Sequence, residues 1–159
     1  MAGVVAAILL FVQILLATRG KLLKNLFGIA ALMRWHRVNG IVLSILAITH
    51  ATLILAPEGL MNLPLGKKYW PQMVGMLMLC IVLSMAVTSN YREKFKFNYK
   101  KWRMLHKPLG YLVIILLVVH VLFVSESFEC TVPRIALLTI FAAVASEVVL
   151  SKKNKWLSK

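Results

Sequence analysis

Apolar residues gather in five long runs along the chain, and short polar or basic segments separate these runs. The runs cover residues 3–18, 38–55, 71–88, 108–124 and 133–150. Each approaches the ~20 residues that an α-helix needs to cross ~30 Å of hydrocarbon, where a helix satisfies its own backbone hydrogen bonds. The pattern therefore predicts an all-α integral membrane protein with a bundle of about five transmembrane helices, the first being the shortest.

The N-terminal run has no positively charged segment before it, and its basic residues follow the apolar stretch. That order is the reverse of the order in a cleaved signal peptide, so the run is expected to remain as the first span. The next segment, residues 21–33, alternates basic and apolar residues. It is expected to form either an amphipathic helix in the membrane interface or an extension of a neighbouring span.

Composition agrees with a membrane location. The chain of 159 residues is 60% hydrophobic, whereas soluble domains are usually about 45–50% apolar. Nineteen Lys and Arg residues against five Asp and Glu residues give a net charge of +14, which in a soluble protein would suggest a nucleic-acid partner. Here the basic residues flank the spans, where membrane topology and anionic lipid headgroups account for them, so no nucleic-acid partner is expected.

The basic residues also orient the bundle. Three segments on one side of the membrane hold sixteen of the nineteen cations. These sixteen are Arg19, Lys21, Lys24, Arg34 and Arg37, then Arg92, Lys94, Lys96, Lys100, Lys101, Arg103 and Lys107, and finally Lys152, Lys153, Lys155 and Lys159. The opposite side has Lys67, Lys68 and Arg134. The positive-inside rule then predicts a multi-pass protein of the cell (inner) membrane with its N-terminus outside and its C-terminus in the cytoplasm.

All four histidines of the chain lie in or beside two of the spans. His36 and His50 are fourteen residues apart, and so are His106 and His120. Fourteen helical residues rotate by about 1,400°, some 40° short of four turns, and rise about 21 Å. The two spans run parallel because one span lies between them in the chain. The spacing thus predicts two histidine pairs, His36 with His106 at the cytoplasmic level and His50 with His120 at the outer level.

Paired imidazoles at two depths point to a particular chemistry. Ionisable groups inside a bilayer are costly, and a single histidine there is explained by a hydrogen bond between helices, but two matched pairs are not. Zinc would require further ligands, and no Cys or acidic residue lies at these depths. Haem iron accepts axial imidazoles in an apolar cleft between helices. The pattern therefore predicts two stacked b-type haems with both axial positions filled, which relay electrons and leave no iron position open to a substrate.

Five residues near the histidines are candidates for further contacts with the cofactor. Gly40 and Gly110 each follow a histidine by four residues, where a missing side chain would admit the edge of the macrocycle; close helix packing is the alternative. Arg34, Arg37 and Arg103 flank the inner pair and could hold haem propionates as charge-assisted partners. Their alternative explanation is membrane topology.

Other polar residues in the spans have ordinary explanations. The two cysteines form neither a CxxC nor a CxxCH motif, and Cys80 is expected to be a buried apolar filler. Gln13 is expected to form an interhelical hydrogen bond. Glu147 is expected to pair with Lys152 or Lys153 at the interface, with a role in proton or quinol chemistry as the alternative.

Two stretches resemble a known family. "LLATRGKLLKNLFGIAALMRWHRVNGIVLSILAITHATLIL" and "WRMLHKPLGYLVIILLVVH" are similar to the ferric reductase-like transmembrane domain of NADPH oxidases, yeast-type ferric reductases and the membrane haem subunit of bacterial methionine sulfoxide reductase systems. The resemblance implies that the four histidines are the axial ligands of an inner and an outer haem. It also implies electron transfer from a cytoplasmic flavin across both haems to an acceptor outside.

The chain departs from many members of this family in two respects. We expect residues 1–159 to include neither the FAD and NAD(P)H domains that usually follow the spans nor the extra span that often precedes them. We therefore expect residues 1–159 to form a single haem domain, or a piece of a larger protein. Electrons would come from a separate flavoprotein carrying FAD or FMN, or from a quinol.

The expected function is that of an oxidoreductase component, a di-haem cytochrome that reduces ferric iron, dioxygen or a partner reductase at the outer face. Two alternatives remain open from the sequence. One is a haem-containing anchor subunit of a larger oxidoreductase. The other is a transporter that uses the histidines as a relay.

Overall fold

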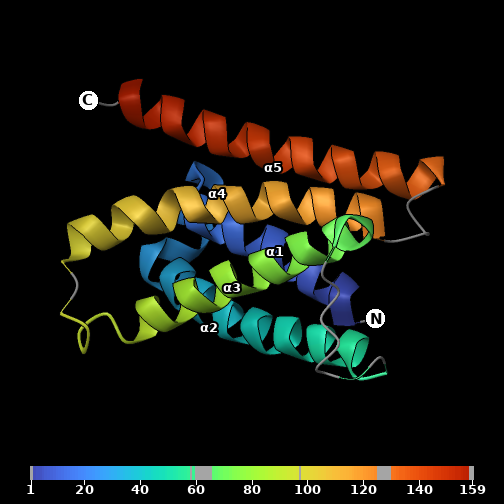
Figure 1. Cartoon of the computed structure of the whole chain (residues 1–159). Helices are drawn as coiled ribbons and strands as arrows, with labels where there is room; N and C mark the ends of the chain where they lie inside the picture. Colours follow the sequence, from blue (N-terminus) through green and yellow to red (C-terminus); the bar gives the residue numbers. More distant parts are fainter. Residues whose placement is uncertain (1, 58, 60–65, 97, 125–129, 158–159) are drawn as a thin grey trace.

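The structure, a computed structural model, describes residues 2–57, 59, 66–96, 98–124 and 130–157, with side chains described as far as residue 150. The described part is built of helices and contains no strand. The elements are α1 (Ala2–Thr18), α2 (Lys21–Leu55), the short 3-10 helix η1 (Lys67–Tyr69), α3 (Trp70–Asn90), α4 (Tyr99–Val124) and α5 (Thr131–Leu157) (Figure 1). The predicted all-α architecture is confirmed.

Within the described residues, four helical stretches are long and apolar enough to cross a membrane. They are Lys21–Leu55, Lys67–Asn90, Tyr99–Val124 and Thr131–Leu150. The helix Ala2–Thr18 is apolar but shorter, as the pattern predicted for the first run. The chain is therefore a multi-pass membrane protein.

A kink at Gly28 divides residues 21–33: residues 21–27 form a short helical arm, and the residues after the kink extend the following span. Gly28 has φ 74° and ψ 158° within α2. Glycine adopts positive φ without the Cβ clash that other residues meet, so the sequence supplies the residue that this bend requires. The bend divides α2 into a basic arm, residues 21–27, and a long span that carries His36 and His50.

The helices pack as two antiparallel pairs. α1 packs most extensively against α2, α3 packs most extensively against α4, and α5 lies along α1 and α4. Figure 1 shows α2 and α4 running in the same direction, as their order in the chain requires. The two helices that carry the histidines are thus parallel, and α1 and α3 lie beside them.

The core is centred on α1, the shortest of the α-helices. Leu10, Phe11 and Ile14 of α1 are buried against side chains from α2, α4 and α5. These partners are Leu43, Val113, Ile114, Leu117, Leu137 and Val144. A helix that is apolar on every side is stable only when other helices or lipid surround it, so this central position explains the composition of α1.

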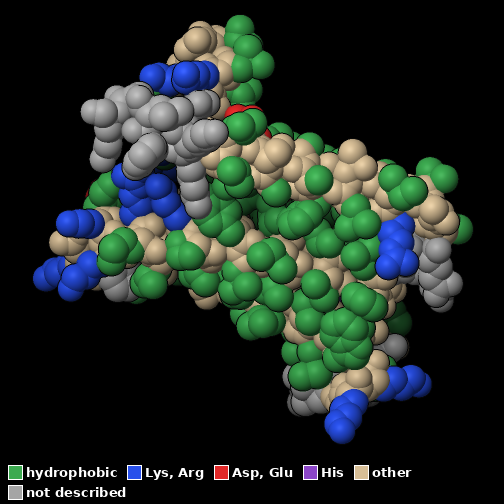
Figure 2. Space-filling view, turned by 90° about the horizontal axis from the view of Figure 1, so that it is seen from above, with side chains coloured by type: hydrophobic (Ala, Val, Ile, Leu, Met, Phe, Trp, Pro, Cys, Tyr) green, Lys and Arg blue, Asp and Glu red, His purple; other side chains and the backbone are tan. Residues whose placement is uncertain are grey.

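The surface is apolar between its charged ends. Figure 2 shows hydrophobic side chains over the middle of the visible face and Lys and Arg side chains at its margins. Large side chains such as Ile45, Leu77 and Ile115 are more than half exposed, which suits contact with lipid tails. Cys80 also lies on this exposed surface. The expectation that it is a buried filler was wrong, because lipid-facing and core-facing positions of a membrane helix are equally apolar.

Candidate functional site

The inner histidines lie together between α2 and α4. The ring centroids of His36 and His106 are 6.5 Å apart, and their planes make an angle of 70°. Trp102, one turn before His106 on α4, packs on that imidazole with a centroid distance of 4.5 Å and an angle of 35°. The two parallel helices therefore bring together the pair that the fourteen-residue spacing indicated.

The outer histidines are also neighbours, and both rings rest on glycines. His50 and His120 are close enough to interact electrostatically. A Cβ atom added to Gly3 of α1 would lie 2.8 Å from Cε1 of His50, and one added to Gly75 of α3 would lie 2.5 Å from Cε1 of His120. Each outer imidazole thus fills the space that a glycine leaves on the adjacent helix.

Hydrogen bonds orient one imidazole at each level. Nδ1 of His36 lies 3.2 Å from the carbonyl oxygen of Gln13, and Nδ1 of His120 lies 2.8 Å from the carbonyl oxygen of Pro71. A carbonyl oxygen can only accept, so Nδ1 must carry the proton in both rings. The Nε2 atom of a neutral imidazole then keeps its lone pair, which can bind a metal or accept a hydrogen bond.

A polar cluster surrounds His36. Nδ2 of Asn39 donates to the carbonyl of Leu9 at 3.0 Å and to Oε1 of Gln13 at 2.7 Å. Nε2 of Gln13 lies 3.4 Å from Nε2 of His36. The expected interhelical hydrogen bonding of Gln13 is confirmed. Asn39 was not singled out from the sequence, although an amide three residues after a histidine in an apolar run is a signal that could have identified it.

The two candidate glycines have different surroundings. A Cβ atom on Gly40 would lie 2.9 Å from Nε2 of Gln13, so this glycine makes room for the amide that faces His36. A Cβ atom on Gly110 would lie 3.7 Å from Cδ1 of Ile14 and 3.8 Å from Cε of Met85, which is ordinary packing distance. Gly40 therefore belongs to the polar cluster, while Gly110 lies at a contact between helices.

The three candidate arginines, Arg34, Arg37 and Arg103, are exposed. Arg103 borders an open cavity of about 390 Å³ at the start of α4. The other residues lining this cavity are Tyr99, Lys100, Met104 and Lys107. We call the row of Lys100, Arg103 and Lys107 the α4 basic row; it lies next to the turn that carries Trp102 and His106.

A different arginine approaches the inner pair. Arg19 lies between α1 and α2 and is close enough to His36 to interact with it electrostatically. Its Nη2 lies 2.8 Å from Sδ of Met33, and its Nε is buried without a hydrogen-bond partner in the described part of the chain. On the sequence alone, Arg19 was only one of the basic residues that orient the bundle. Its proximity to His36 could not be predicted, because it depends on how the chain turns at Gly20.

Glu147 lies against the same turn. Its carboxylate contacts the position that a Cβ atom of Gly20 would occupy. Gly20 is buried and precedes the first residue of α2. The expected pairing of Glu147 with Lys152 or Lys153 concerns side chains outside the described residues.

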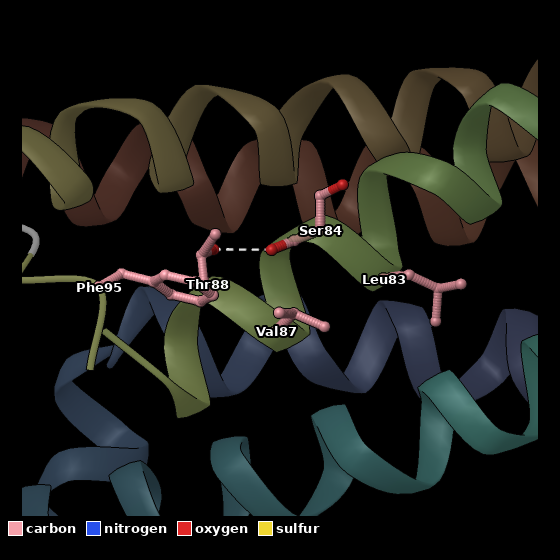
Figure 3. Close-up of a pocket in the computed structure, with 5 residues that line it drawn as sticks. All are labelled: Leu83, Ser84, Val87, Thr88 and Phe95. Atoms are coloured by element: carbon pink, nitrogen blue, oxygen red, sulfur yellow. Dashed lines mark hydrogen bonds between the residues drawn. The ribbon is translucent and has the colours of Figure 1, made fainter. Parts of the chain in front are cut away.

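A second cavity, of about 360 Å³, lies on α3 away from the histidines. Figure 3 shows its lining residues Leu83, Ser84, Val87, Thr88 and Phe95. The Thr88 hydroxyl donates to the carbonyl of Ser84 at 2.7 Å, as the dashed line marks. None of the four histidines borders this open, mostly apolar cavity, so it is separate from the candidate site.

Comparison with protein families assigns the chain. The family of the ferric reductase-like transmembrane component matches residues 2–118. The chain belongs to this ferric reductase-like family. The matched range includes His36, His50 and His106 and ends two residues before His120. No curated protein and no solved structure shows significant similarity to the chain.

The inner site of this ferric reductase-like chain fits the haem that such a domain implies. A metal–imidazole bond is about 2 Å long, so two rings on opposite sides of one metal ion have centroids about 6 Å apart. The observed 6.5 Å between His36 and His106 agrees with that arrangement. No group of three or more His, Cys, Asp or Glu side chains suited to a metal ion occurs in the described residues.

Unpartnered polar atoms gather at the same level. Four buried side-chain atoms of the described residues have no hydrogen-bond partner: Arg19 Nε, Trp102 Nε1 and His106 Nδ1 near the inner pair, and Gln72 Oε1 next to Pro71 in the chain. Buried polar groups are normally paired, and an exception requires an explanation such as a ligand. An arginine and an indole N–H beside two imidazoles suit a group that combines a metal ion with carboxylates.

Proposed function

We propose that this ferric reductase-like chain is a transmembrane di-haem b-type cytochrome. It would carry electrons from a cytoplasmic flavin, flavoprotein or quinol donor to an acceptor at the outer face, such as ferric iron, dioxygen or a partner reductase. Membership of the family supports a membrane electron-transfer component. The observation that carries the finer proposal is the meeting of His36 and His106 from two parallel helices, with a second pair fourteen residues further along both.

The four histidines would be the axial ligands, His36 with His106 at the inner level and His50 with His120 at the outer level. When bound, each haem supplies a one-electron ferric–ferrous couple. The Nδ1–H bonds of His36 and His120 support this role because they leave Nε2 unprotonated. A second ring nitrogen bonded to a backbone carbonyl is the usual arrangement of a metal-ligating histidine.

Arg19 and Trp102 would hold the carboxylates of the inner haem. Both have a buried, unpartnered N–H group beside the inner pair, and a guanidinium binds a carboxylate through charge-assisted hydrogen bonds. Arg34, Arg37 and Arg103, the candidates from the sequence, are exposed and would act from the rim. Gly40 would leave space for the Gln13 side chain beside the inner pair. Gly110 would allow α4 to approach the neighbouring helices closely.

The donor would dock at the cytoplasmic end of α4. Lys100, Arg103 and Lys107 border a cavity of about 390 Å³ there, one turn or less from Trp102 and His106. A cluster of cations steers an acidic protein surface or a flavin phosphate toward the site. The excess of basic residues at this end of the bundle supports its location on the cytoplasmic side of the membrane, with the N-terminus outside.

A spectrum tests the proposal. Reduced-minus-oxidised absorption of the purified protein should show a b-type signal, with two haems per chain. Replacing His120 by Ala should remove the outer haem and retain the inner one, and replacing His106 by Ala should do the reverse. A protein without any haem signal would exclude the di-haem function and favour a histidine relay.

A second measurement separates electron transfer from a mere anchor role. Vesicles containing the protein, with a reductant inside, should reduce a membrane-impermeant ferric chelate outside. Haem without such reduction would indicate that the chain anchors another oxidoreductase.

A further inference from the structure

We propose that Gly75 is a positioning residue for the outer haem, and that it acts through the Pro71 carbonyl and His120. This inference rests on the proposed function, because it concerns how an axial ligand is tuned. The glycine leaves a notch in α3 through which the His120 imidazole reaches the helix backbone. The backbone contact then sets the proton position and the donor strength of the ring.

The geometry of the notch follows from the helix repeat. In an α-helix the carbonyl of one residue faces the N–H group four residues later, so the Pro71 oxygen lies beside Gly75. A carbonyl oxygen has two lone pairs and can accept a second hydrogen bond. His120 provides it, with Nδ1 at 2.8 Å from that oxygen.

A side chain at position 75 would close the notch. A Cβ atom there would lie 2.8 Å from Nδ1 and 3.1 Å from Nε2 of His120. Separations below about 3 Å lie inside the van der Waals contact distance, so the ring would have to move away from α3. The hydrogen bond to Pro71 would then lengthen or break.

Neighbouring contacts hold the carbonyl in place. Pro71 is buried, so water does not compete easily for its oxygen. Trp70, at the first position of α3, packs on Phe123 of α4 with a centroid distance of 4.9 Å. This contact fixes the first turn of α3 against the helix turn that carries His120.

The chemical consequence is a difference between the two outer ligands. A hydrogen bond from Nδ1–H to a carbonyl raises the basicity of the metal-binding nitrogen. A more basic ligand stabilises ferric over ferrous iron and lowers the reduction potential. His50 rests on Gly3 in the same manner, but within the described residues its ring has no hydrogen bond to a backbone carbonyl. Gly75 therefore tunes the potential, whereas Gly3 provides space.

The test compares Gly75→Ala with Gly3→Ala in the haem-loaded protein, using redox titration monitored by absorption and EPR. Both variants should alter the EPR spectrum of the outer haem, since both displace an outer imidazole. Gly75→Ala alone should raise the outer potential. We expect a shift of about tenfold in the ferric–ferrous ratio, which equals about 59 mV for one electron.

The inner haem is the internal control, since its potential should not change in either variant. An unchanged outer potential in Gly75→Ala, equal shifts of both haems, or the same rise in Gly3→Ala would overturn the proposal. A wild-type protein that binds no haem would instead refute the proposed function itself.

A measurement on the unmodified protein covers the case in which Gly75→Ala does not fold. NMR of the reduced, diamagnetic protein labelled with ¹⁵N-histidine reports hydrogen exchange of each axial imidazole N–H. The N–H of His120 should be protected from exchange. Rapid exchange of this proton would contradict the bond to Pro71 and, with it, the role of Gly75.

Discussion

Asn39 of α2 donates a 2.7 Å side-chain hydrogen bond to Gln13 of α1. The bond joins the two helices one turn from His36, whose imidazole contacts Gln13 twice. Asn39 also reaches the carbonyl of Leu9. Asn39, which is not a candidate ligand, thus positions Gln13, and Gln13 orients the His36 imidazole.

Replacing Asn39 by Leu should destabilise the inner level. The change leaves the Gln13 amide without its partner, and interhelical hydrogen bonds in membranes contribute about 0.6–1.7 kcal/mol. The inner haem should be released at a lower temperature, while the outer haem is affected less. Thermal release followed by the absorption of each haem checks this. Thr49→Val is the matched control, because the exposed Thr49 hydroxyl bonds only within α2; equal losses in both variants would contradict the role of Asn39.

Gly20→Ala should destabilise the turn between α1 and α2. The new Cβ atom would collide with the Glu147 carboxylate, and overpacking of this kind costs about 1–3 kcal/mol. The double variant Gly20→Ala/Glu147→Ala should recover much of the loss, because removing the carboxylate frees the space. Unfolding of all four proteins in detergent forms a double-mutant cycle. A coupling energy near zero would show that the two residues do not meet.

Arg19→Gln should weaken retention of the inner haem. Removing a charge-assisted hydrogen bond costs about 1.5–3 kcal/mol, roughly tenfold to a hundredfold in affinity. Loss of a cation beside His36 should also lower the reduction potential of the inner haem. A nearby positive charge favours ferrous iron, which carries one positive charge fewer than ferric iron. Haem transfer to apomyoglobin and redox titration measure the two effects. Arg34→Gln, at an exposed position, should have a smaller effect than Arg19→Gln. A larger effect of Arg34→Gln would indicate that Arg34, and not Arg19, binds the carboxylates of the inner haem.

The α4 basic row should govern the rate at which an acidic donor delivers electrons. Exchanging Lys100, Arg103 and Lys107 for Gln should slow reduction by an acidic flavoprotein about tenfold or more at low salt, and it should flatten the dependence on ionic strength. Stopped-flow reduction at several salt concentrations provides the measurement. The double variant Lys67→Gln/Lys68→Gln changes cations at the opposite end of the bundle. A similar slowing there would argue against docking at α4.

The helices and the histidine pairing could be predicted from local properties of the chain. Apolar run length predicts a membrane helix because hydrocarbon leaves backbone groups no other partner. The fourteen-residue interval predicts that two histidines share one face because helical rotation is fixed at about 100° per residue. The close approach of His36 and His106 agrees with the pairing, and the family match over residues 2–118 agrees with the resemblance.

The surroundings of the histidines could not be predicted in this way. Gly3, Gly75 and the Pro71 carbonyl meet imidazoles that are 45 or more residues away in the chain. Arg19, not the arginines nearest His36 in sequence, has a buried unpartnered nitrogen there. Such contacts depend on the rotation and register of whole helices. Cys80 illustrates the same difficulty, since its exposure could not be inferred from an apolar neighbourhood.

The sequence by itself therefore determined the spans, the two parallel helices that carry the histidines and the two depths of the pairs. These follow from helix geometry and from the cost of placing polar backbone in lipid. The tertiary structure decided which groups of α1 and α3 touch each imidazole. Lipid and protein interior are equally apolar, so hydrophobic periodicity does not distinguish the faces of a membrane helix, and close packing at small residues selects the contact.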